Sequence, residues 1–481
     1  MPLSIDQQPL YTILPIGQQV IFAVSEAVMV ATTYNVKFIA EVHVSDKAIN
    51  ISNDDALIGT FKTTPNNAGV GIFDLRPILE TFVSPDHDAN NENPLSVPQY
   101  KGSSTSNAAI PLHIVDKFSI STNSIKYFAI RFKLEYSGTP NGPMYVLGQD
   151  LTTDVFTMFN GVLQYDDTLA VSSTAGSNDF GYPLFNDPNF FPILAYGDGE
   201  YQFLTNSPRT QYARLTDYGT LPFLNFLLNS SNQLSSVTFK YYWDGGSSTE
   251  TVDFTAGNGG SGLQNTSKIR LGYVGAFPAN LKNWSSTFAT AVTNGLTYYT
   301  VKAVANNASI RPLTYTINVL CPNEKGYEGI RLTWLNKWGT WDYYTFNMKS
   351  TRSITTNRTS YSQLGGTWNE STFKISGYKG GKKNFRVNST EKIKLNTGFV
   401  TEADGVWFEQ LINSSEVYVL EGFQTDITAT GVTSIPSLLN NYVQPARITN
   451  SSYIRKTIAN DKLMQYTFEI EKSKIKRTQA V

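Results

Sequence analysis

Residues 331–346 read RLTWLNKWGTWDYYTF, and their pattern predicts a tight β-hairpin that carries many aromatic rings. Leu332 and Trp334 alternate with other residues, which places their side chains on one face of a strand. Residues 336–339 have the polar and glycine character of a turn, and alternation resumes at Trp341. Because two short strands joined by such a turn pair side by side, the stretch favours an antiparallel sheet.

The rings of this hairpin are the first candidates for an interface or a ligand contact, namely Trp334, Trp338, Trp341, Tyr343 and Tyr344. Aromatic pairs across strands stabilise a sheet by up to about 1 kcal/mol each, so a role in the core or an interface is the main interpretation. Trp and Tyr are frequent anchors of subunit contacts, and Trp338 at the turn could instead stack on a sugar. We expect Trp334→Ala to destabilise the fold and Trp338→Ala to weaken assembly or binding more than folding.

Strand patterns continue on both sides of the hairpin. Alternation in residues 35–45 and 124–138 predicts two half-buried strands, and residues 235–257 predict a hairpin that turns at Asp244-Gly245-Gly246. Residues 73–83 and 433–443 are the best candidates for short helices. We therefore predict a mainly β chain of tandem antiparallel β-sandwich domains, with immunoglobulin-like and jelly-roll topologies both open.

Polar stretches rich in glycine and proline suggest where the domains end. Cuts near residues 145 and 321 give an N-terminal sandwich (1–145), a middle β domain (146–320) and a C-terminal sandwich with the aromatic hairpin (321–481). Residues 84–109 are predicted to form a long loop inside the first domain. The middle domain contains the hairpin expected around residues 237–255.

Charge and composition narrow the classes of partner. The formal net charge is −1, and the only basic cluster expected from the sequence is the tail Lys472–Arg477, so no nucleic-acid partner is expected. Cys321 is the only cysteine, which excludes a disulfide within the chain. The apolar run near the N-terminus is interrupted by Glu26, and no stretch approaches the roughly 18 apolar residues of a membrane helix. We expect assembly in the cytoplasm without membrane insertion.

Few residues suggest catalysis or metal binding. The three histidines (His43, His87, His113) lie in different contexts, with His43 expected on the solvent face of its strand. The adjacent acids at 54–55, at 166–167 and at Glu402/Asp404 lie beside turn residues, so surface or turn roles are expected. We therefore expect no catalytic residues, no metal and no cofactor, and a glycan depolymerase remains the enzymatic alternative.

Four segments carry a family resemblance: WLNKWGTWDYYTF (334–346), STRSITTNRTSY (350–361), GIFDLRPILETFV (71–83) and FLTNSPR (203–209). Together they resemble virion structural proteins of tailed bacteriophages from marine and related bacteria. The resemblance implies a β-rich component of the tail or baseplate that is present in several copies. Its motifs are structural, so it supplies no catalytic residues.

The sequence therefore predicts a non-enzymatic virion protein of a phage tail that builds a ring or collar with copies of itself and neighbouring virion proteins. The alternative is an adhesin on the tail that binds a receptor or surface glycan of the host. Trp243, beside the Asp244 turn, is a second aromatic contact candidate, and Arg209, after Pro208, is a candidate polar anchor.

Overall fold

The computed structural model describes residues 3–9, 13–46, 56–89, 111–121, 123–162, 200–201, 203–225, 234–253, 270–305, 311–320, 326–367, 370–420, 442–457 and 463–478. By its internal contacts the chain divides into two compact units. Unit 1 includes Met1–Leu320, and unit 2 is built from Cys321–Trp334, Tyr343–Gln424 and Asn441–Val481. The turn of the aromatic hairpin, Leu335–Asp342, belongs to unit 1.

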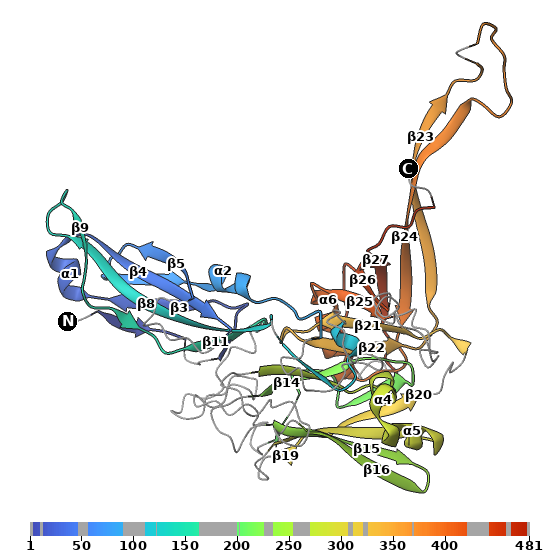
Figure 1. Cartoon of the computed structure of the whole chain (residues 1–481), viewed down its shortest axis with the longest axis horizontal. Helices are drawn as coiled ribbons and strands as arrows, with labels where there is room; N and C mark the ends of the chain where they lie inside the picture. The colour runs from blue at the N-terminus through green and yellow to red at the C-terminus, as the bar shows by residue number, and fades with distance from the viewer. Residues whose placement is uncertain are drawn as a thin grey trace. The chain divides into compact units, whose positions relative to one another are not determined.

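Unit 1 begins with two sheets packed face to face (Figure 1). The smaller sheet has the order β1–β3–β6, with bounds Ser4–Gln7, Ile21–Ser25 and Val70–Asp74. The larger has the order β2–β11–β8–β4–β5, with bounds Ile13–Pro15, Phe156–Phe159, Ile125–Ser137, Tyr34–Ser45 and Leu57–Thr63. Strands β9 (Met144–Val146) and β10 (Leu151–Thr152) also pair with β8. Phe22 of β3 packs against Phe132 of β8 with ring centroids 5.8 Å apart, so the core lies between the sheets.

Short helical turns complete this part of unit 1. They are α1 (Ala27–Thr32), α2 (Arg76–Leu79), η2 (Glu80–Phe82) and η3 (Leu112–Ile114). Strand β7 (Phe118–Ile120) leaves the two sheets and pairs antiparallel with β17 (Arg270–Gly275), which pairs in turn with β14 (Thr220–Asn225). Asn280 reinforces this junction by donating to the backbone oxygens of His113 and Val115 at 3.1 and 2.7 Å.

The rest of unit 1 is a five-stranded sheet covered by a helix (Figure 1). Its order is β13–β20–β18–β15–β16, with bounds Thr210–Arg214, Tyr315–Leu320, Tyr298–Ala305, Leu234–Trp243 and Gly246–Asp253. A short parallel pair joins β12 (Glu200–Tyr201) to β19 (Arg311–Pro312). Helices α4 (Pro278–Trp284) and α5 (Ser286–Thr293) follow β17, and α5 packs on the sheet through Phe288, whose ring lies 5.4 Å from that of Tyr241.

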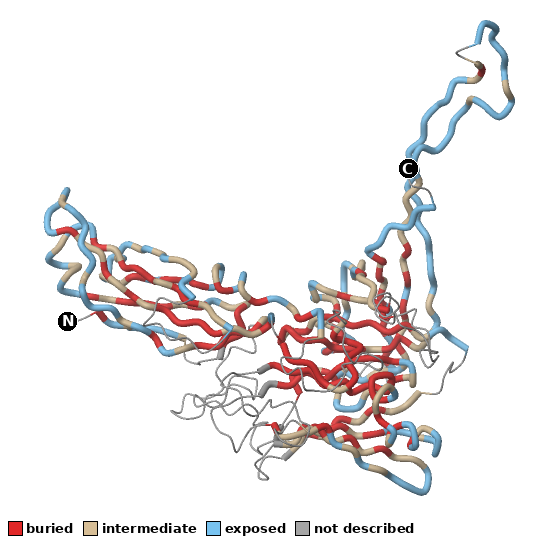
Figure 2. Tube along the Cα trace, viewed as in Figure 1, coloured by how far each residue is buried: buried red, intermediate tan, exposed pale blue. Residues whose placement is uncertain are grey.

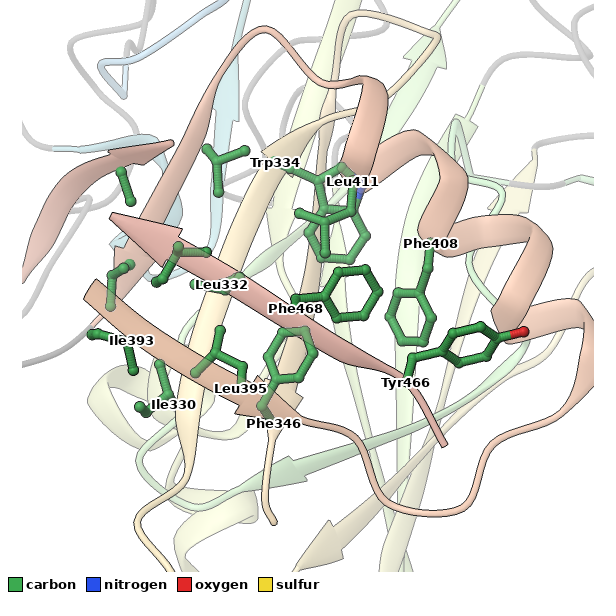
Figure 3. Packing of buried hydrophobic residues seen from close by; sticks show 14 of the residues in the cluster. Ile330, Leu332, Trp334, Phe346, Ile393, Leu395, Phe408, Leu411, Tyr466 and Phe468 are labelled. Atoms are coloured by element: carbon green, nitrogen blue, oxygen red, sulfur yellow. The ribbon is translucent and has the colours of Figure 1, made fainter. Parts of the chain in front are cut away.

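Unit 2 is one seven-stranded sheet with a helix on its apolar face. Its order is β22–β21–β25–β26–β27–β24–β23, with bounds Trp341–Phe346, Ile330–Leu335, Val417–Leu420, Val443–Ile448, Thr467–Lys472, Gly381–Asn396 and Thr351–Gln363. Helix α6 (Glu402–Asn413) starts at Thr401 in a capping box with Asp404, which fixes its first turn. Phe408 and Leu411 of α6 point into a core that Phe346, Leu395 and Phe468 line from the sheet (Figure 3).

The expected mainly β fold with antiparallel sheets and few short helices is confirmed. The strands predicted at 35–45 and 124–138 are β4 and β8, and the predicted hairpin is β15–β16, which turns at Asp244 and Gly245. The helix predicted at residues 73–83 is shorter than expected, because β6 runs to Asp74 and only α2 and η2 follow. The helix predicted at 433–443 and most of the loop predicted at 84–109 lie outside the described residues.

The domain boundary expected near residue 145 falls within β9. The larger sheet of unit 1 continues past this boundary to Phe159 at the end of β11. The cut expected near residue 321 lies beside Leu320, where the first segment of unit 1 ends.

Candidate interaction surface

The turn of the aromatic hairpin is buried in unit 1, which corrects the expectation of an exposed ring at its tip. Trp338 is only 1% exposed, and its Nε1 donates to Oδ1 of Asn206 at 2.8 Å. Its ring lies 6.3 Å from that of Phe159, and the backbone oxygen of Lys337 accepts from the amide of Val162 at 2.7 Å. A ring enclosed in this way is not available to stack on a sugar or to contact another subunit.

Trp341 and Asp342 hold the same turn in place from other directions. Trp341 Nε1 donates to the backbone oxygen of Asp86 at 2.8 Å, and the ring of His113 meets the indole edge-on at 5.0 Å. Asp342 accepts from the hydroxyl of Thr205 at 2.6 Å. The turn therefore fastens together segments of unit 1 that are far apart in the sequence.

The remaining hairpin rings stabilise unit 2. Trp334 is fully buried against Trp407 of α6, with ring centroids 4.9 Å apart. Tyr344 is partly buried and meets Phe408 of α6 edge-on at 4.9 Å. Tyr343 is buried, with the guanidinium of Arg331 5.3 Å above its ring. These contacts place the three rings inside unit 2, which is the core part of the core-or-interface interpretation.

The two candidates outside the hairpin lie at separate places in unit 1. Trp243 is partly buried at the β15–β16 turn, where its indole lies so close over Gly246 that an added Cβ would be 2.9 Å from Nε1. Arg209 is exposed, and its backbone oxygen accepts from the amide of Thr316 at 2.7 Å, which ties the start of β13 to β20. Arg209 lies within electrostatic range of Tyr315, as does Asp342 of the hairpin turn.

Two of the three histidines, His43 and His113, are buried, whereas His87 is exposed. His43 is fully buried, not solvent-facing as expected, because β4 is covered on both faces. Asp86 is buried and accepts from Ser124 Oγ at 2.6 Å and from the amide of Asn123 at 2.9 Å. Asp404 caps α6, and the adjacent acids at 54–55 and 166–167 lie outside the described residues. Within the described ranges no cluster of His, Cys, Asp and Glu has the size needed for a metal site.

The most exposed element of the described chain is the ribbon of β23 and β24 (Figure 2). All 13 residues of β23 are exposed. At its base, Lys392–Asn396 of β24 also pair with β27 and Ser389 forms a bridge with Lys476, whereas farther out the described strands β23 and β24 have only each other. We call residues 354–390 the arm. A two-stranded ribbon is marginally stable in water by itself, so the arm is an element that benefits from a partner.

The arm concentrates apolar side chains at the surface. Of the 23 large hydrophobic residues that are exposed in the described chain, seven lie on it: Ile354, Tyr361, Leu364, Phe373, Ile375, Tyr378 and Phe385. Burying one such side chain contributes about 1.5–3 kcal/mol, and contiguous exposed apolar area is typical of interaction sites.

The arm is also strongly basic. Residues 354–390 contain six Lys or Arg residues and one acidic residue, Glu370, in a chain whose net charge is −1. In the sequence only the tail Lys472–Arg477 stands out as basic, because the arm's cations are dispersed among Ser, Thr, Asn and Gly. A scan of local net charge would have found them.

Glu391 anchors the base of the arm. It accepts from Arg352 of β23 at 2.8 Å and from Lys476, and Lys472 of β27 lies 3.9 Å away. Burial by itself raises the pKa of Glu391, but the hydrogen bonds from Lys476 and Arg352 and the nearby positive charges outweigh it and hold the pKa at about 2. The ribbon is therefore fixed at its base and exposed along its length.

No protein-family model matches this sequence, and no curated protein is significantly similar to it. No helix within the described ranges combines the length and the apolar character needed to cross a membrane.

Proposed function

We propose that this chain is a non-enzymatic structural protein of a bacteriophage virion, present in several copies in the tail or baseplate and assembled in the host cytoplasm. The observation that carries the assembly role is the arm, whose strand β23 is exposed at every residue and whose surface bears seven large apolar side chains. Exposed strand edges pair readily with other chains, and proteins that stay monomeric usually protect them. The position in a phage tail rests on the resemblance of the four segments quoted above.

Within this proposal the arm contributes the contact and the aromatic hairpin contributes rigidity. Trp338 and Trp341 fasten the turn inside unit 1, and Trp334 packs under α6 in unit 2. Rigid units with one protruding contact element suit a ring or collar, because repeated identical contacts generate symmetry.

Quantitative mass spectrometry of purified phage particles tests the proposal. We expect this chain in the particles at a copy number that is a multiple of three or six, counted against the other virion proteins. Its absence from particles that contain the remaining tail proteins would overturn the proposal.

A host-binding role on the tail is the second candidate, and one feature of the arm favours it. An open hollow of about 720 Å³ near the arm's end is lined by Tyr361, Gln363, Glu370 and Lys379, among others. An aromatic ring beside charged and amide groups suits a polar ligand such as a glycan. Tyr361→Ala is then expected to abolish binding of intact particles to host cells without changing the number of particles assembled. Normal adsorption by the variant would argue against this role.

A further inference from the structure

The arm needs a surface that is apolar, acidic and able to accept a strand. Its apolar side chains include Phe385, which is 55% exposed, and Tyr361, which is 44% exposed. Its net charge from residues 354–390 is +5. The outer edge of β23 has no strand beside it in the described chain, so its backbone groups face outward.

Strand β9 in unit 1 has the complementary properties. Met144, Tyr145 and Val146 are 38%, 54% and 56% exposed, so the whole strand presents apolar side chains. It pairs only with β8 among the described strands, which leaves its second edge open. Across the sheet, Met144 of β9 is paired with Ser137 of β8, and Ser137 is paired with Tyr34 of β4. Because Tyr34 is 49% exposed, exposed apolar side chains extend from β9 to β4.

The charge distribution selects this part of the chain as the partner of the arm. Residues 1–162 contain 15 Asp or Glu and nine Lys or Arg, a net charge of −6. Residues 163–320 carry a net charge of only −2. Contact between two arms would bring together two surfaces with a net charge of +5 each, whereas contact with residues 1–162 pairs net charges of opposite sign.

From these observations we propose that the arm of one copy docks by strand addition onto β9 of a second copy of this chain. The inference rests on the proposed assembly function and names its contact. Main-chain hydrogen bonds along the open edges of β23 and β9 supply the register, and the apolar residues of both strands are buried together. Because arm and β9 are different surfaces, the contact is heterologous, and its repetition gives a closed ring or an open filament.

The first experiment mixes full-length protein of natural isotope composition with ¹⁵N-labelled protein and couples carboxylates directly to amines with a carbodiimide. We expect mixed-isotope cross-links from Lys382 or Lys383 of the arm to Asp150, which follows the end of β9 by four residues and whose side chain is 41% exposed. Links that occur only within one isotope form would place the contact inside a single copy and overturn the inference.

The second experiment measures self-association of the full-length protein by analytical ultracentrifugation. Phe385→Ser and Tyr145→Ser are each expected to raise the dissociation constant at least tenfold. The matched controls are Phe399→Ser and Tyr212→Ser, because these residues are 59% and 56% exposed but lie outside the arm and β9. The controls should leave the dissociation constant unchanged.

Besides cross-links confined to one isotope form, three results would overturn the inference: a monomer at all concentrations, cross-links between two arms, or equal effects of the test and control variants. None of them would remove the chain from phage particles. The copy count in particles therefore tests the proposed function separately from the arm contact.

Discussion

Trp334 and Trp338 are four positions apart, yet they complete the cores of different units. Trp334 packs on Trp407, and Trp338 packs on Phe159. Strand alternation predicted that the Trp334 side chain faces a core. It could not predict the burial of Trp338, because the residues that cover a turn come from distant parts of the sequence.

Both substitutions are therefore expected to destabilise the protein, contrary to the division between folding and assembly expected from the sequence. Trp334→Ala and Trp338→Ala should each lower the free energy of unfolding by about 3–5 kcal/mol, since each removes a fully buried indole. Chemical denaturation measures both, with Tyr378→Ala as the control, because Tyr378 is 77% exposed. Loss of stability in only one of the two Trp variants would contradict this expectation.

Gly339 of the hairpin turn has no space for a side chain. Its φ is 70°, and an added Cβ would lie 1.4 Å from the backbone oxygen of Asn160. Gly295, with φ of 86° and open space around it, is a matched control. Gly295→Ala should cost about 1–2 kcal/mol for the left-handed backbone, and Gly339→Ala should cost about 1–3 kcal/mol more for overpacking. Thermal denaturation measures the stability of both variants. Equal losses of stability would show that the turn is not packed against Asn160.

At the scale of elements, strands with period-two alternation were predictable and the arm was not. β4, β8 and the β15–β16 hairpin alternate because one or both faces are buried. β23 reads TRSITTNRTSYSQ, with few apolar residues, because neither face is buried. Burial creates the pattern on which sequence analysis depends, so an element that functions exposed leaves little signal. The candidate interaction surface was missed for that reason.

The base of the arm should be sensitive to acid. Glu391 has a pKa of about 2 in the folded protein, below its ordinary value of 4.5, so its contribution to stability is fully present above pH 4.5 and is lost as the pH falls toward 2. We expect hydrogen exchange of Lys392–Asn396, corrected for the intrinsic rate, to be faster at about pH 3 than at about pH 6.

Glu391→Gln is the control for this effect. It removes the titrating carboxylate, so protection at the base of the arm should be weaker at both pH values and should no longer change between them. The same pH dependence in the wild-type protein and in the variant would assign the effect to another group.

For the whole molecule, the sequence predicted the mainly β class but not how one hairpin is shared between two units. Local substitutions should reveal this sharing. Trp338→Ala is expected to accelerate hydrogen exchange in β11, and Trp334→Ala in β25 and α6, since these are the elements around each ring. Exchange that increases in the same segments for both variants would show that the two tryptophans act on one cooperative unit.

Because the chain is made from its N-terminus, the partner of Trp338 is synthesised well before Trp338 itself. Phe159, which is buried in the folded protein beside Trp338, leaves the ribosome long before Trp338 is made. At translation rates of about 5–20 residues per second the delay is about 10–40 s. During that interval the nascent chain exposes an apolar site that the finished protein hides, so chaperones have a defined period in which to bind there.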